Sequence, residues 1–247
     1  MAIVTVLSCL ITLVVTPHQT AAIGMYEESA VPKEAYPLPP LPYPYGGLEP
    51  HMDERTVQIH HQGHHAAYTT KMNAALKQWR EEDPGNTFAK SSILNILQNV
   101  SSVPEKYRTA LRNNGGGYFN HAIYWACMSP GGAAITPDLK SDIIQNFGTY
   151  DNFKDQFTTK AMALFGSGYV WLSRGGNDKL VISTTANQDS PVTESFRPIL
   201  VIDIWEHAYY LKYQYRRADF VAAWWKLVDW KAVVDLDKWW RVNYRYG

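Results

Sequence analysis

The chain has 247 residues, which is enough for one large domain or two small ones. Lys and Arg together number 23, as do Asp and Glu, so the formal net charge is zero. This balance argues against nucleic acid as the main partner, because phosphate binding needs a basic surface. Nine Trp and sixteen Tyr suit a well-packed globular core and point to no particular function.

The first 22 residues contain no Asp, Glu, Lys or Arg. Their apolar run, Ile3 to Val15, is short for a membrane span but has the length of a signal-peptide core. We therefore expect residues 1–22 to be a signal peptide, although the usual basic residues before the core are missing. The mature protein would be extracellular, without a membrane span, and its sequon at Asn99 would be open to N-glycosylation. A mitochondrial matrix location is the alternative, but a transit peptide should be Arg-rich.

The first half of the chain is typical of helices with short connections. Residues 23–36 form an N-terminal extension. Seven prolines between residues 31 and 50 predict an extended arm, because proline cannot donate to a helix or sheet ladder. Side chains that recur every three or four residues then predict the helices Asp53–Arg80, Ser91–Val100, Glu105–Asn113 and Tyr118–Met128, with the glycines 115–117 interrupting the last two.

The second half mixes helices with a small sheet. In chain order, the pattern predicts helices Pro137–Phe147 and Tyr150–Ala163, strands Gly168–Ser173, Lys179–Thr184 and Ile199–Trp205, and helices from about Ala208 onward, of which Asp219–Val234 is the clearest. We therefore expect an α+β fold. A helical domain would span residues 37–130, and an α/β domain with a three-stranded antiparallel sheet would span residues 131–247.

Four potential metal ligands are spread along the chain: His60, His121, Asp203 and His207. Three imidazoles and one carboxylate suit iron, manganese or zinc and leave room for a further ligand. Asp203 gives the strongest signal, because it interrupts the apolar run I-L-V-I-D-I-W, where an unpaired carboxylate would be costly. If the four converge in the fold, they form a redox or hydrolytic metal centre.

Each of these residues also has a simpler interpretation. His60 belongs to the cluster H-H-Q-G-H-H, whose histidines are equally compatible with surface or hydrogen-bonded imidazoles. A zinc-protease pattern would need a Glu directly after the first His, and none is present. His121 alone is more typical of a satisfied core residue, and Asp203 with His207 would also suit a hydrogen-bonded pair.

Five strings surround these residues. They are L-P-P-L-P-Y-P-Y-G-G-L-E-P-H-M, H-H-Q-G-H-H-A-A-Y, L-R-N-N-G-G-G-Y-F-N-H-A-I-Y-W, T-A-N-Q-D-S-P and D-I-W-E-H-A-Y-Y-L-K-Y. In these motifs the chain resembles the iron/manganese superoxide dismutase family, from about Leu38 to Arg241. Five separate motifs in the family's order make the resemblance highly specific.

The resemblance implies a helical hairpin domain and a C-terminal α/β domain with a metal ion between them. His60, His121, Asp203 and His207 would bind the ion, with a solvent molecule as the fifth ligand. The implied reaction is dismutation of superoxide by one manganese or iron ion per subunit that cycles between +3 and +2, in a homodimer or homotetramer. Zinc would not serve, because it has no accessible redox couple.

Further roles are implied position by position. His64 and Tyr68 would line the substrate funnel and form a proton relay with Gln188. Two tryptophans, Trp171 and Trp205, would wall the site. The remaining assignments are Arg217, which would attract the anion near the entrance, and two dimer contacts, Glu206 at a metal-ligand histidine of the partner and Tyr210 at the partner's His64.

Two positions bear on the choice of metal. In the manganese-type pattern a glutamine from the N-Q-D string bonds the bound solvent, and here this is Gln188. In many iron-type members the glutamine comes from a position that is Gly117 in this chain. The sequence therefore resembles the manganese type, with iron as the alternative. Tyr169 stands where the family usually has Trp, so product release or peroxide inhibition is expected to differ, but metal binding is not.

Two other functions compete with this interpretation. The first is an extracellular metal-binding or adhesive module that keeps the fold without fast turnover. The second is a zinc hydrolase built on the histidine cluster, which leaves Gln188 without a role. The zero net charge also implies that any steering of superoxide is local, from groups such as Arg217.

Overall fold

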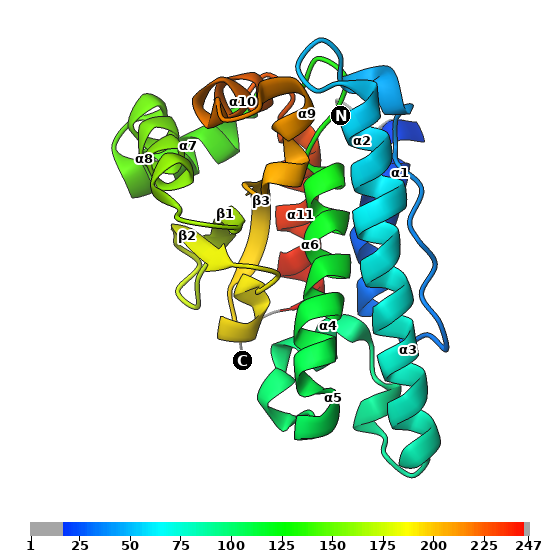
Figure 1. Ribbon diagram of the computed structural model, residues 1–247. Helices are drawn as coiled ribbons and strands as arrows, with labels where there is room; N and C mark the ends of the chain where they lie inside the picture. The colour runs from blue at the N-terminus through cyan, green and yellow to red at the C-terminus, as the bar shows by residue number, and fades with distance from the viewer. Residues whose placement is uncertain (1–16, 245–247) are drawn as a thin grey trace, which may run out of the picture.

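The computed structural model describes residues 17–244, with side chains from residue 24 onward. The chain forms a helical half and an α/β half that lie side by side (Figure 1). The helices of the first half are α1 Pro17–Ala30, α2 Glu54–Ile59, α3 Ala66–Glu82, α4 Ile93–Gln98, α5 Glu105–Ala110 and α6 Gly116–Ala126. The second half contains α7 Pro137–Phe147, α8 Tyr150–Ala163, β1 Gly168–Arg174, β2 Leu180–Ala186, β3 Arg197–Asp203, α9 Tyr210–Tyr213, α10 Arg217–Trp224 and α11 Trp230–Asn243.

The first long helix carries the histidine cluster. The Asp53 side chain caps its start by accepting the Thr56 amide. Helices α2 and α3 are joined without a break by the π-helical segment His60–His65, so the helix expected from Asp53 is confirmed. Single-turn π segments occur often at functional sites, because they re-aim side chains on an otherwise regular helix.

The glycine run after α5 does not interrupt a helix, and this expectation was wrong. Helix α5 continues through the π-helical segment Leu111–Gly115 directly into α6. The glycines are needed for close packing. A Cβ on Gly115 would lie 2.8 Å from Ile93, and one on Gly117 would lie 2.5 Å from the ring of Tyr68.

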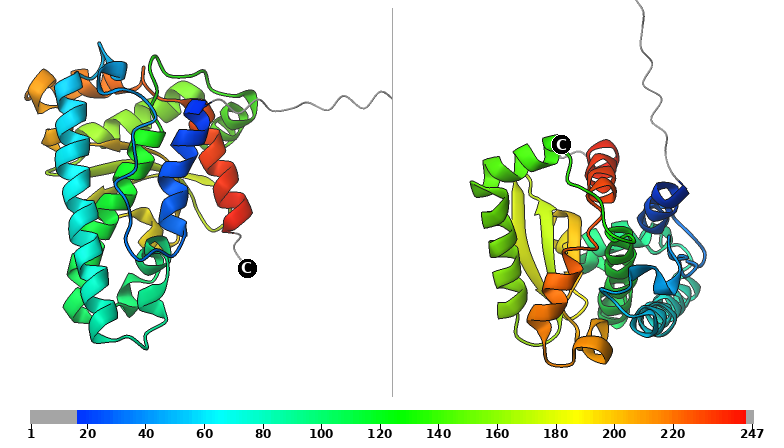
Figure 2. Two further views of the ribbon diagram at one scale, coloured as in Figure 1. Left: turned by 90° about the vertical axis from the view of Figure 1, so that its right-hand side faces the viewer. Right: turned by 90° about the horizontal axis from the view of Figure 1, so that it is seen from above.

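The sheet is antiparallel, with strand order β2–β1–β3. Helices α7 and α8 pack against β1 and β2, while α6 and α11 pack against β3, so the sheet lies between two helical layers (Figure 2). Strand β3 ends two residues before the expected Trp205, because the Asp203 carboxylate accepts the Trp205 amide at 2.7 Å and turns the chain. The α+β prediction with a three-stranded antiparallel sheet is confirmed.

The helix expected over Asp219–Val234 is two helices. Helix α10 ends at Trp224, and α11 begins at Trp230. Between them Val228 forms a β-bridge with Met128, and the Asp229 side chain accepts amides of the first turn of α11. The bridge is a tertiary contact and the cap is a local one, and apolar periodicity reveals neither of them.

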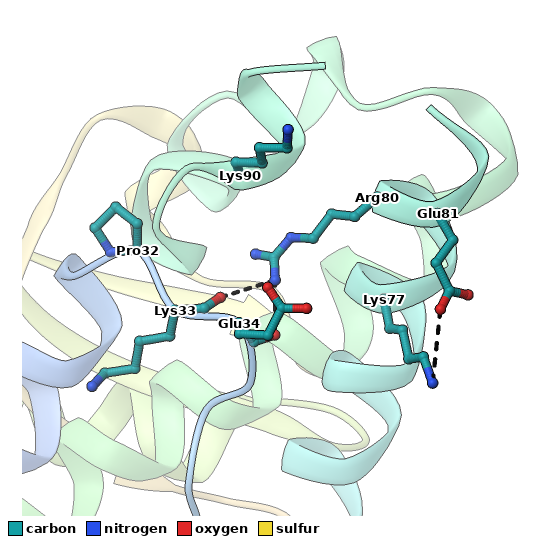
Figure 3. A pocket seen from close by; sticks show the side chains of 7 residues that line it. All are labelled: Pro32, Lys33, Glu34, Lys77, Arg80, Glu81 and Lys90. Carbon is teal, nitrogen blue, oxygen red and sulfur yellow. Dashed lines mark hydrogen bonds and ion pairs between the residues drawn. The ribbon is translucent and has the colours of Figure 1, made fainter. Parts of the chain in front are cut away.

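The proline-rich arm runs along the helical half without helix until a short 3-10 turn at Tyr45–Leu48. Arg80 of α3 fixes its start by donating to the carbonyl oxygens of Lys33 and Glu34, at 2.9 and 2.8 Å (Figure 3). A third hydrogen bond from Arg80 reaches the Ala89 carbonyl, so one guanidinium joins the arm, α3 and the following turn.

Helix α1 is an element that the sequence did not predict. It packs against α6, α11 and α4, and its Met25 and Tyr26 are 1% exposed. The Tyr26 ring meets Trp239 of α11 edge to face at 5.3 Å. Residues 17–22 of the expected signal peptide are helical here, and residues 1–16 lie outside the described residues. Within residues 17–244 no helix is both long and apolar enough to cross a bilayer.

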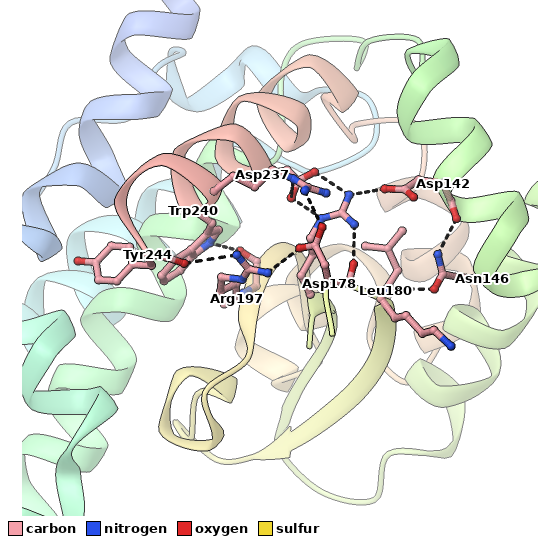
Figure 4. A network of polar contacts seen from close by, with 12 residues as sticks. Asp142, Asn146, Asp178, Leu180, Arg197, Asp237, Trp240 and Tyr244 are labelled. Atoms are coloured by element: carbon pink, nitrogen blue, oxygen red, sulfur yellow. Dashed lines mark hydrogen bonds and ion pairs between the residues drawn. The ribbon is translucent and has the colours of Figure 1, made fainter. Parts of the chain in front are cut away.

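A buried ion network ties the sheet to the helices around it (Figure 4). Arg174, at the end of β1 and 2% exposed, donates to both carboxylate oxygens of Asp237 on α11, at 2.5 and 2.7 Å. It also reaches Asp142 on α7 at 2.5 Å. Losing one partner of such a pair leaves a buried charge uncompensated, which costs about 3–5 kcal/mol.

Candidate metal centre

The four residues singled out in the sequence converge between the two halves of the molecule. His60 comes from the π-helical segment, His121 from α6, Asp203 from the end of β3 and His207 from the turn after it. One ligand atom from each lies within 4.8 Å of every other. Asp203 Oδ2 is 3.2 Å from His60 Nε2, 3.4 Å from His207 Nε2 and 3.9 Å from His121 Nε2.

Neighbouring backbone groups aim two of these side chains at the centre. The Nδ1–H of His121 donates to the Gly117 carbonyl at 2.6 Å, which leaves Nε2 free to bind a metal. Asp203 uses Oδ1 to accept the Trp205 amide, which leaves Oδ2 on the side of the histidines. Such hydrogen bonds set the orientation of both ligands and, for His121, also the tautomer of the ring.

The arrangement fits a metal ion. His121 Nε2 and Asp203 Oδ2 are fully buried and have no hydrogen-bond partner within the described chain, although they crowd together. Buried polar atoms of this kind need an explanation, and a shared cation supplies one. Two donors that each lie about 2.1 Å from one ion sit about 3.0–3.6 Å apart at coordination angles of 90–120°. The separations of 3.2 and 3.4 Å from Asp203 Oδ2 to His60 and His207 fall in this range.

The electrostatics keep the ligands in their metal-binding forms. Burial lowers the pKa of His60 well below its usual value and that of His121 to about 4, so both imidazoles are neutral at pH 7. Burial also favours protonation of Asp203, but His207 and His60 outweigh it and hold the pKa of the carboxyl well below its usual range. The site therefore offers the anionic Asp203 and the neutral imidazoles of His60 and His121 as donors.

A line of hydrogen bonds runs beside His121. The Tyr169 hydroxyl donates to Gln188 Oε1 at 2.9 Å, and Gln188 Nε2 donates to the Tyr68 hydroxyl at 3.0 Å. The rings of Tyr169 and Tyr68 lie 6.3 and 5.3 Å from the His121 ring. Burial raises the pKa of Tyr169 well above its usual value, so its hydroxyl stays protonated and acts as the donor.

The bond from Tyr169 to Gln188 was missed in the sequence, where Tyr169 was expected to alter only product release or peroxide inhibition. Its signal lay in the strand register, because Tyr169 on β1 stands opposite Asp203 on β3. A residue paired with a metal ligand faces the same layer, but this register is not visible without the tertiary structure. The position of Gly117 beside the Tyr68 ring also leaves no room for a glutamine there.

Three other predicted residues, His64, Trp205 and Arg217, lie on the His207 side of the centre. His64 stacks on His207 with ring centroids 3.9 Å apart, and Trp205 stacks on the same histidine at 5.4 Å. Arg217 lines a cavity of about 530 Å³ together with Trp205 and His207. Its guanidinium donates to the Leu164 carbonyl at 2.6 Å, so only part of its donor capacity faces the cavity.

Three further residues were predicted in or near the site: Trp171, Glu206 and Tyr210. Trp171 is fully buried beside Tyr169 and donates to Thr185. Glu206 and Tyr210 are exposed, and Glu206 lines the same cavity as His207.

The rest of the histidine cluster has structural partners. His61 bonds the Pro39 carbonyl and the Tyr45 hydroxyl, and His65 bonds the Tyr118 carbonyl. Only His60 of the cluster joins the metal set. A hydrolytic site made of the cluster alone is therefore not formed.

Comparison with known proteins agrees with this geometry. The model of the iron/manganese superoxide dismutases, alpha-hairpin domain, matches residues 35–129, and that of their C-terminal domain matches residues 135–236. The chain is similar to proteins named superoxide dismutase [Mn/Fe] 2 from Staphylococcus aureus strains bovine RF122 / ET3-1, Mu50 and N315. In each case the identity is 45% over 205 residues, covering 82% of this chain and 97% of the relative.

The chain belongs to the iron/manganese superoxide dismutase family. Its activity is that of a superoxide dismutase, which converts two superoxide radicals and two protons into dioxygen and hydrogen peroxide. The cofactor is manganese or iron, with one four-residue site per chain. The family assignment sets aside zinc hydrolysis, because zinc lacks the redox couple that the reaction needs.

Proposed function

We propose that Gln188 tunes the redox chemistry of this dismutase, with Tyr68 as its partner toward the substrate. The observation that carries the proposal is the hydrogen-bonded line from Tyr169 through Gln188 to Tyr68, beside the ligand His121. Manganese or iron, when bound, supplies the one-electron couple. A buried amide whose oxygen is already engaged presents only N–H donors, and donors beside a metal's solvent ligand shift the potential through its proton affinity.

Tyr68 and His64 are the residues we assign to proton supply. Burial raises the pKa of Tyr68, so its hydroxyl holds a proton at neutral pH within reach of Gln188. His64 is half-buried and stacks on His207, and burial together with His207 lowers its pKa. The hydrogen bonds of residues 17–244 connect Tyr68 to Gln188 and not to His64, so solvent would have to join Tyr68 to His64.

Reconstitution tests these assignments. Metal-free protein loaded separately with manganese and with iron should be active with manganese, because Gln188 occupies the position of the manganese-type glutamine. An Asp203→Ala variant should fail to retain metal, whereas Gln188→Ala should retain it and dismute superoxide more slowly, by about 10–100-fold. Fully manganese-loaded protein without dismutation would overturn the proposal, and the metal-binding module would then be the better description.

We also propose that two copies associate across the mouth of the site. Phe165 is fully exposed and lines the cavity at His207, and Tyr210, three residues after His207, is 49% exposed. A second copy would bury these rings and bring its Glu206 to His207, whose side chain is 13% exposed. Sedimentation should give a homodimer or a homotetramer, and Glu206→Ala should weaken it. A monomer at micromolar concentration would contradict the assignment.

For localisation we propose secretion after removal of residues 1–22. Removal at this point would keep the packed part of α1, including Met25 and Tyr26. Asn99 is exposed at the end of α4, where a glycan would not disturb the core. N-terminal sequencing of protein from the culture medium, with and without glycosidase, tests both points. A retained leader on protein found only inside mitochondria would favour the matrix alternative.

A further inference from the structure

Gln188 sits on a loop and not on a regular element. It follows β2, which ends at Ala186, and its neighbour Asn187 has a φ of 53°. Loops hold side chains less precisely than helices or strands do, whereas functional groups need placement within about 0.5 Å. Contacts with the surrounding structure must therefore hold the loop in place.

The helical half holds this loop at three points. The Asn120 amide of α6 donates to the carbonyl oxygens of Gln188 and Asp189, at 3.1 and 3.2 Å. Arg112 binds Asp189 in a bidentate pair, with Nε and Nη2 each 2.6 Å from a carboxylate oxygen. Gly116 lets the backbone approach, because a Cβ there would lie 2.1 Å from the Gln188 carbonyl oxygen.

We propose that Arg112, Asn120 and Asp189 form a loop clamp that positions Gln188 for the reaction. The clamp residues Arg112 and Asn120 belong to the same continuous helix that supplies the metal ligand His121. The helix therefore fixes the position of Gln188 relative to the metal ligand His121, although Gln188 belongs to the other half of the molecule. This inference rests on the proposed role of Gln188.

The bidentate pair has the geometry to act in this way. A planar guanidinium that shares two parallel hydrogen bonds with a carboxylate fixes direction as well as distance. Arg112 is 54% exposed and Asp189 is 28% exposed, so the pair adds little to global stability. Its loss should therefore change the placement of Gln188 more than it changes folding.

The experiment compares Arg112→Gln with Arg108→Gln in manganese-loaded protein. Arg108 lies on the same continuous helix and, like Arg112, lines a surface cavity of about 490 Å³, but its Nε donates to the Val103 carbonyl. The measurements are the reduction potential, the visible spectrum of the oxidised manganese form, turnover and the melting temperature. Arg112→Gln should move the potential and spectrum in the direction of Gln188→Ala and slow turnover about 3–10-fold, below the usual effect of residues that contact a ligand. Arg108→Gln should match the wild type.

Charge exchange provides the second variant. Arg112→Asp alone should shift the reduction potential and the spectrum away from the wild type. Adding Asp189→Arg should reverse at least part of both shifts, because the ion pair is re-formed with opposite polarity. The clamp is overturned if Arg112→Gln lowers only the melting temperature while Gln188→Ala shifts the potential and spectrum. If Gln188→Ala itself leaves both unchanged, the proposed function of Gln188 fails instead.

Discussion

The contact between Gly116 and the Gln188 loop leads to the sharpest test of the site. In a helix interior, Gly→Ala normally stabilises by about 1 kcal/mol, because alanine loses less backbone entropy on folding. At Gly116 the added Cβ would lie 2.1 Å from the Gln188 carbonyl oxygen. The atoms must separate by about 1 Å before the contact becomes tolerable, and the loop is easier to move than the helix.

A displacement of this size should be costly for catalysis. Misplacing a reacting or positioning group by about 1 Å can reduce the rate about 100-fold. The shift also lengthens the hydrogen bond from Asn120 to the Gln188 carbonyl. Because neither Gly116 nor Gln188 is a predicted metal ligand, the Gly116→Ala variant should keep its metal while turnover falls by about 100-fold. Overpacking should lower the free energy of unfolding by about 1–3 kcal/mol.

The assay is turnover of superoxide by stopped-flow absorbance, together with metal content and thermal unfolding. Gly63→Ala is the matched control. Gly63 lies in the π-helical segment His60–His65 and Gly116 directly follows the other one, but a Cβ added at Gly63 would be 3.8 Å from Ile59, an ordinary contact. Gly63→Ala should keep wild-type turnover. Metal-loaded Gly116→Ala with wild-type turnover would refute the argument that the loop position controls the reaction.

Three further predictions follow from the geometry. Tyr169→Phe should retain metal but slow turnover about 10-fold, because Gln188 Oε1 loses its donor; unchanged kinetics would contradict this. Burial lowers the pKa of His121 to about 4 in the metal-free folded protein, whereas the unfolded chain protonates it near pH 6.5. The free energy of unfolding measured in urea should therefore fall by about 3 kcal/mol from pH 6.5 to 4. A flat profile would argue against a buried neutral His121. Tyr26→Ala should lower the free energy of unfolding by about 3–5 kcal/mol with metal content unchanged, because its ring packs on Trp239; calorimetry without a stability loss would contradict the docking of α1.

Much of the architecture could be read from local pattern. Helices α7 and α8 have the predicted bounds, because their apolar spacing agrees with their N-caps, Thr136 and Thr149. The ends of the three strands were predicted to within two residues. These features depend on neighbouring residues, which the sequence displays directly.

The largest misses depend on distant contacts, whereas the early end of β3 depends on the local hydrogen bond from the Trp205 amide to Asp203. The run at Gly115–Gly117 has the composition of a break, but its glycines are there so that Ile93, Gln188 and Tyr68 can approach a continuous helix. The split between α10 and α11 depends on a bridge to Met128, and α1 depends on a surface formed by α6 and α11.

The metal centre divides in the same way. The residue types and motifs determined which four ligands to expect, because a carboxylate inside an apolar strand and histidines in family strings carry that information locally. Their convergence within 4.8 Å, the freeing of Asp203 Oδ2 by the Trp205 amide and the bond from Tyr169 to Gln188 were decided only by tertiary structure. The reason is physical: a ligand's identity is a property of its side chain, whereas its aim depends on the register of β1 against β3 and on the packing of two halves of the chain, which no single segment encodes.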